Sequence, residues 1–143
     1  MATGVKVNKG RGIYTVIAKK SVLGAKVINE LREDMGKIED LVIDTRDNRV
    51  AYAILSFGGI LGMGEKRFAI PWEALSFDIS DKTAVLNVEQ HRIKNAPGFD
   101  ENDWPDFADR EWGTQVHSHY GYEPYWNRNP SQTSTTASEE RRR

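Results

Sequence analysis

Three histidines are the side chains of this sequence best suited to bind a metal. His117 and His119 are separated by one residue, and His91 lies elsewhere in the chain. Histidines two residues apart share one face of a strand but not of a helix, where zinc-binding pairs are typically four residues apart. The chain has no cysteine to supply a thiolate ligand. The pattern therefore favours surface histidines beside an aromatic segment, and we predict neither a metal nor a cofactor.

Two adjacent carboxylates, Glu39 and Asp40, could do acid–base chemistry if burial raised the pKa of one of them. Neighbouring residues of a strand point to opposite faces, so these two cannot act as a pair. Glu73, which follows Pro71 and Trp72, is likewise expected to hold a turn in place. The sequence shows no Ser-His-Asp spacing and no nucleophile elbow. We therefore predict that the protein is not an enzyme.

A glycine-rich run at residues 57–64 raises the question of phosphate binding. It lacks the Gly-Lys-Ser/Thr of a phosphate-binding loop, and a strand rather than a helix is predicted after it. The run contains no charged residue, and its apolar side chains are Phe57, Ile60, Leu61 and Met63. Because these side chains are too apolar to remain in water, we expect the aromatic C-terminal extension or a second subunit to cover them.

Hydrophobic patterning predicts three strands around these residues, at 37–44, 49–57 and 66–71. Asp47 and Asn48 tolerate the left-handed backbone of a tight turn, so the first two strands are predicted to form a hairpin. The second strand reads VAYAILSF after Arg49, with no charge, which predicts burial on both faces. Trp72 then begins a predicted helical turn and is expected to anchor it in the core.

Shorter elements flank this central stretch. A first strand is predicted at residues 25–29, with Val27 pointing inward. Gly36 is then predicted to permit the turn that leads into the central stretch. A helical turn is predicted at residues 19–23, before the first strand. After the central stretch, residues 76–79 and 83–88 are predicted to form a hairpin whose buried residues are Val85 and Leu86. A helix is then predicted at 89–95, with Ile93 facing inward.

The composition changes after residue 98. Residues 99–126 hold eight of the 14 aromatic residues of the chain, namely Phe99, Trp104, Phe107, Trp112, Tyr120, Tyr122, Tyr125 and Trp126. Acidic residues crowd positions 100–111, and a helix is predicted at 106–116. So many aromatic rings cannot bury one another within such a short segment, so the extension is expected to dock on another surface.

Three segments carry a family resemblance: GKIEDLVID, RVAYAILSFGG and FAIPWEAL. They resemble the PRC-barrel domain, which is named for the cytoplasmic part of the photosynthetic reaction centre H subunit and recurs in a ribosome maturation factor. The resemblance covers most of residues 18–126 and is closest to small stand-alone bacterial members. It implies a mainly β fold, a small antiparallel PRC-type β-barrel with short helices and an aromatic-rich C-terminal extension.

The expected organisation has four parts. Residues 1–17 are predicted to form a flexible N-terminal arm, 18–97 the PRC-barrel domain, 98–126 an aromatic and acidic extension packed on the barrel or on a partner, and 127–143 a disordered tail. No apolar run approaches the roughly 20 residues that span a bilayer, and the N-terminus does not read as a signal peptide. We therefore expect a cytoplasmic protein.

The net charge and the family resemblance together limit the functions that this protein can have. Lys and Arg total 20 against 21 Asp and Glu, which gives the whole chain no general attraction to nucleic acid. The resemblance implies a non-enzymatic protein-interaction or assembly module, which we predict to be a homodimer. Its predicted interaction residues are Phe57, Ile60, Leu61, Met63, Trp104 and Trp112. The alternative is an accessory factor in ribosome maturation or RNA metabolism, for which a continuous basic surface would be needed.

Overall fold

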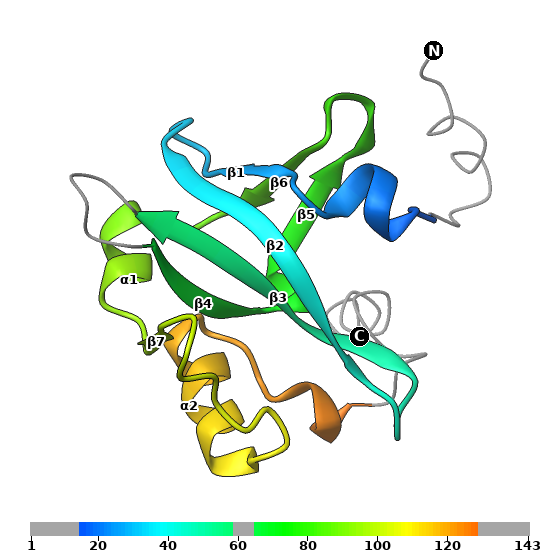
Figure 1. The fold of residues 1–143 in the computed structure, drawn as a ribbon, viewed down its shortest axis with the longest axis vertical. Coiled ribbons are helices and arrows are strands. Elements are labelled where there is room, and N and C mark those ends of the chain that lie inside the picture. Colours follow the sequence, from blue (N-terminus) through cyan, green and yellow to red (C-terminus); the bar gives the residue numbers. More distant parts are fainter. Residues whose placement is uncertain (1–14, 59–64, 129–143) are drawn as a thin grey trace, which may run out of the picture.

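The computed structural model describes residues 15–58 and 65–128. Seven strands form one sheet in the order β5-β6-β1-β2-β3-β4-β7 (Figure 1). The strands are β1 (Lys26–Ile28), β2 (Asp34–Asp44), β3 (Arg49–Gly58), β4 (Glu65–Pro71), β5 (Leu75–Asp78), β6 (Thr83–Leu86) and β7 (Gly98–Phe99). The helical elements are η2 (Ala18–Val22), η3 (Trp72–Ala74), η4 (Ile79–Asp81), α1 (Gln90–Lys94), α2 (Arg110–His119) and η5 (Tyr125–Asn127).

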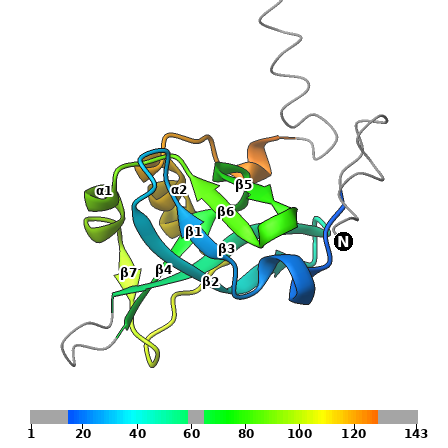
Figure 2. The ribbon, with the colours of Figure 1, turned by 90° about the horizontal axis from the view of Figure 1, so that it is seen from above.

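The pairing of the strands confirms the mainly β fold and corrects one part of the prediction. Five of the six strand pairs are antiparallel, but β1 pairs with β6 in parallel, with Val27 opposite Ala84. The sheet curls strongly, as Figure 2 shows from above. Within the described ranges its edge strands, β5 and β7, do not pair with each other, so closure into a complete barrel is not seen.

Strand β3 forms the centre of the core. It pairs with β2 on one side and β4 on the other, and all six residues from Ala51 to Ser56 are buried. The prediction that this strand is buried on both faces is confirmed. Val27 of β1 and Ile93 of α1 are also fully buried, as predicted. Apolar burial of this kind is the main favourable term for such a small domain.

Three details differ from the sequence-based expectations. Strand β2 begins at Asp34, so Gly36 lies inside the strand and not in a turn. Its φ is +100°, and a Cβ there would lie 2.2 Å from the carbonyl oxygen of Ser56, so only glycine fits beside β3. The buried pair of β6 is Ala84 and Leu86, because alternate strand residues share a face. Trp72 is half-buried, with its ring centroid 5.1 Å from that of Phe77, and is not a fully buried anchor.

Candidate functional site

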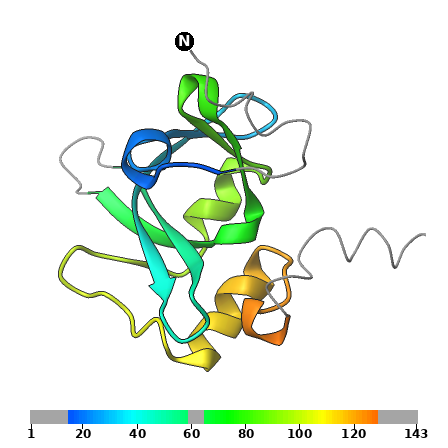
Figure 3. The same cartoon turned by 90° about the vertical axis from the view of Figure 1, so that its right-hand side faces the viewer.

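The C-terminal extension joins the sheet before it forms its helix. Phe99 and Gly98 of β7 pair with Arg67 and Phe68 of β4, and the chain then continues to α2 and η5. Figure 3 shows the β2–β3 hairpin reaching down beside α2 and η5. Helix α2 begins later than predicted because the Asp109 side chain accepts hydrogen bonds from the amides of Glu111 and Trp112, which caps the helix.

Tyr52 of β3 is the point at which the extension and the sheet meet. The side chain is fully buried, and its ring centroid lies 5.4 Å from Trp112, 5.4 Å from His117, 6.1 Å from Tyr125 and 6.2 Å from Phe107. All four of these rings belong to the extension, and all are tilted or edge-on to Tyr52. Such arrangements add to the free energy gained by burying aromatic area. We call these five residues the Tyr52 cluster.

Gly113 allows α2 to lie against the Tyr52 cluster. A Cβ at this position would be 2.7 Å from the Tyr52 hydroxyl and 2.7 Å from the Trp126 ring. Real Cβ atoms do not approach other atoms so closely, and both of these neighbours are themselves packed. Sequence reasoning did not single out Gly113, although a glycine within a predicted helix is itself a sign of close packing.

The two tyrosine hydroxyls of the cluster have opposite environments. Tyr125 donates a 2.5 Å hydrogen bond to the Oδ2 of Asp44, which is the largest cause of the lowered pKa of that carboxyl. The Tyr52 hydroxyl is buried with no hydrogen-bond partner among the described residues. Burial raises the pKa of both phenols, and for Tyr125 the bond to Asp44 raises it further. Both therefore remain protonated at neutral pH.

His117 contradicts the prediction of a surface histidine. It is fully buried in α2, and its Nδ1 lies 2.8 Å from the carbonyl oxygen of Gly113, while its Nε2 is buried without a partner among the described residues. Burial lowers the pKa of His117, and the hydrogen bond to the Gly113 carbonyl partly opposes this effect. His119 is half-buried with its Nε2 2.8 Å from the Arg92 carbonyl oxygen, and His91 is exposed.

The described residues contain no group of three or more His, Cys, Asp or Glu side chains placed to hold a metal ion. The absence of a metal and of a cofactor from this protein stays a prediction.

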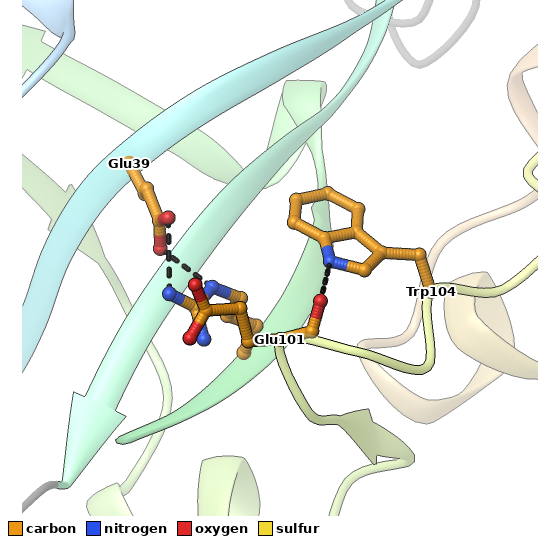
Figure 4. A network of polar contacts seen from close by, with 4 residues as sticks. Glu39, Glu101 and Trp104 are labelled. Atoms are coloured by element: carbon orange, nitrogen blue, oxygen red, sulfur yellow. Dashed lines mark hydrogen bonds and ion pairs between the residues drawn. The ribbon is translucent and has the colours of Figure 1, made fainter. Parts of the chain in front are cut away.

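Two of the carboxylates considered for catalysis, Glu39 and Glu73, form ion pairs with arginines. Glu39 receives two hydrogen bonds from the Arg67 guanidinium, at 2.9 and 3.2 Å. Figure 4 shows Glu39 in a group of polar contacts with Glu101 and Trp104, and the Trp104 indole donates a 2.7 Å hydrogen bond to the Glu101 carbonyl oxygen. Glu73 forms an ion pair with Arg128 at the end of η5. A bidentate guanidinium–carboxylate contact fixes geometry more firmly than a single ion pair does.

The three predicted interaction residues that the structure describes do not gather in one place. Trp112 is half-buried within the Tyr52 cluster, and Trp104 is 43% exposed at its rim, 5.1 Å from the Phe99 ring centroid. Phe57 is half-buried at the far end of β3, where the Lys94 ammonium lies 6.0 Å from its ring centroid. The three other predicted residues lie outside the described part of the chain: Ile60, Leu61 and Met63.

A groove that the sequence did not reveal lies between the β2–β3 hairpin and the extension. Its volume is about 670 Å³. The hairpin wall includes Ile43, Arg46 and Asp47, and the extension wall includes Asp106 and Phe107. The Ile43 side chain is 58% exposed. An exposed apolar side chain among charged neighbours, in a groove formed by two separate segments, is the strongest candidate binding site in the described residues.

Comparison with protein families identifies the class of protein to which this fold belongs. The model of the PRC-barrel domain matches residues 15–91, which are 77 of the 143 residues. The chain therefore belongs to the PRC-barrel domain family, and the resemblance seen in the sequence is confirmed. A search of curated proteins found no match. The Tyr52 cluster joins β3, inside the matched region, to an extension that lies beyond it.

None of the helices in residues 15–58 and 65–128 has the length and the apolar character needed to cross a membrane.

The two hydroxyls of the cluster give a paired prediction. We expect Tyr52→Phe to leave the free energy of unfolding unchanged or raise it by up to about 1 kcal/mol, because it removes a buried polar group that has no partner. We expect Tyr125→Phe to lower it by about 1.5–3 kcal/mol at pH 7, because it removes a hydrogen bond to a charged carboxylate. Chemical denaturation of both variants is the measurement.

The destabilisation caused by Tyr125→Phe should also depend on pH. The lowered pKa of Asp44 stabilises the fold above the unfolded value of about 3.9, and this contribution is lost as the pH falls further. The cost of Tyr125→Phe should therefore shrink below about pH 4. Equal destabilisation by the two substitutions would contradict the hydrogen-bond assignments.

Proposed function

We propose that this PRC-barrel protein is a non-enzymatic protein-interaction module that binds a partner in the groove between the hairpin and the extension. The observation that carries the proposal is Ile43, a large apolar side chain that is 58% exposed within that groove. Charged side chains border it, among them Arg46 and Asp47. An apolar centre with a polar rim is the usual composition of a protein–protein contact surface.

The ionisable groups of the groove support binding more than catalysis. The pKa of Asp44 is lowered, first by the Tyr125 hydrogen bond, so this carboxylate is ionised near neutral pH and is poorly suited to act as a general acid. The Arg110 guanidinium lies 5.2 Å from the Trp126 ring centroid, where it stacks on the aromatic face. These side chains build the walls of the groove.

The second part of the proposal is that the protein forms a dimer, with the contact between the two copies at residues 57–64. This run presents Ile60, Leu61 and Met63 without a charged residue, and loops between strands normally lie at the surface. Phe57, at the start of the run, is half-buried. A twofold pair would let each copy cover the apolar run of the other, and twofold dimers are the commonest closed assembly.

One observation favours the alternative of a role in RNA metabolism. Lys26 of β1 lies opposite Lys37 of β2, and Lys19 and Lys20 are exposed on η2. The Lys82 ammonium is near Gly24, which follows η2. These lysines lie on η2, β1 and β2 and just before β6, and none of them lines the groove. Single-stranded RNA binding that weakens steeply with added salt would favour this alternative.

The groove is tested by capture of partners from the native cell with purified wild-type and variant chains. We expect Ile43→Asp to abolish capture of specific partners, because it replaces an exposed apolar side chain of the groove wall with a charge. Leu31→Asp is the matched control, since Leu31 is 73% exposed in the β1–β2 turn, away from the groove. A partner that Ile43→Asp still captures and Leu31→Asp loses would contradict this assignment.

Self-association is tested separately by sedimentation at micromolar concentration. We expect the wild-type chain and Leu31→Asp to sediment as dimers, and Leu61→Asp to sediment as a folded monomer near 16.2 kDa. Circular dichroism checks that the Leu61→Asp variant keeps its sheet. A wild-type chain that stays near 16.2 kDa at every concentration would rule out the dimer without affecting the groove.

A further inference from the structure

The buried His117 lies at the contact between the extension and the sheet. Its ring centroid is 5.4 Å from Tyr52 of β3, 5.8 Å from Tyr125 and 5.6 Å from Trp126. Nothing in the proposed binding function uses this side chain. It is nevertheless the one group of the Tyr52 cluster whose ordinary titration falls between pH 5 and 8.

The hydrogen bonding of His117 defines its protonation state when the extension is docked. A carbonyl oxygen only accepts hydrogen bonds, so the contact with Gly113 places the proton on Nδ1. Nε2 is then an unprotonated nitrogen, and it is buried without a partner among the described residues. A second proton on Nε2 would create a charge within a cluster of aromatic rings, where the loss of hydration is costly.

The charged groups around His117 do not offset such a charge. Tyr52 on β3 and Tyr125 on η5 are neutral phenols, and the Asp44 carboxylate on β2 is bonded to the Tyr125 hydroxyl. The guanidiniums of Arg49 and Arg110 lie over Tyr125 and Trp126, and both would repel an imidazolium. Arg128, which follows η5, forms an ion pair with Glu73, so the Glu73 carboxylate is already neutralised.

We propose that His117 is a pH-sensitive latch, which is neutral while the extension is docked on β3 and takes up a proton when the extension leaves the sheet. Acidification then favours the undocked extension. Because Phe107, Tyr125 and Trp126 form one wall of the groove, undocking also removes the proposed binding site. The latch goes beyond the proposed function, and its test does not depend on whether a partner binds.

The direction of the pH effect follows from linkage. In the undocked extension the imidazole has a pKa of about 6.5, whereas burial lowers the pKa of the docked ring. The undocked state therefore binds more protons, so docking is at full strength above about pH 6.5 and weakens as the pH falls below it. If the docked ring stays neutral, the equilibrium constant for undocking rises about tenfold between pH 7.5 and pH 5.5.

Amide hydrogen exchange of the full chain at pH 7.5, 6.5 and 5.5, corrected for the intrinsic rate, tests the latch. We expect the protection of α2 to fall about tenfold between pH 7.5 and 5.5, while the protection of β3 changes much less. His117→Gln should remove this pH dependence. The chain has three histidines in all, so His91→Gln and His119→Gln complete the set of controls and should keep the pH dependence of the wild type.

A direct titration of the histidine rings by NMR covers the case in which His117→Gln fails to dock its extension at any pH. We expect the His117 ring to show a proton on Nδ1 and a pKa below 6.5 in the wild-type chain. A His117 pKa at or above 6.5 would overturn the proposal. So would α2 protection that is constant with pH in the wild type, or that changes equally in His117→Gln.

Discussion

The burial of the Tyr52 ring is the interaction on which the rest of this structure depends. The ring lies on the central strand of the sheet, and four rings of the C-terminal extension pack around it. Gly113 permits that approach because no side chain fits between α2 and the Tyr52 hydroxyl. Once the extension is held there, the β2–β3 hairpin faces a second wall and a groove exists between them. The proposed binding function and the proposed latch both follow from this one contact.

The parts of the fold set by local pattern were predictable from the sequence. An uninterrupted apolar run specified β3 as a strand buried on both faces, and the single inward residue of α1, Ile93, followed from its spacing. The family resemblance was carried by the same stretch and is confirmed over residues 15–91. The crowding of aromatic residues after position 98 likewise indicated a segment that needs a surface on which to pack.

The remaining features depend on contacts between segments far apart in the chain. The parallel pairing of β1 with β6 has no signature in either short strand. His117 was expected at the surface beside an aromatic segment, because its spacing from His119 does not suit a metal site on a helix. The Asp109 cap instead starts α2 at Arg110, and the His117 ring packs against Tyr52. The groove could not be predicted, because its walls come from a hairpin and an extension separated by more than 50 residues. The division into domains and the dimer remain predictions.

The most direct test of this account is an NMR measurement of contacts between the ring protons of Tyr52 and the side chains of Trp112 and His117 at pH 7.5. These centroids are each 5.4 Å from that of Tyr52, so strong nuclear Overhauser cross-peaks are predicted, with ordered α2 amides. Gly113→Ala should weaken them, because a Cβ there would clash with Tyr52, and Thr114→Ala should not, because Thr114 is exposed on the same helix. Absence of these cross-peaks in the wild-type chain, with α2 moving independently of the sheet, would contradict the account.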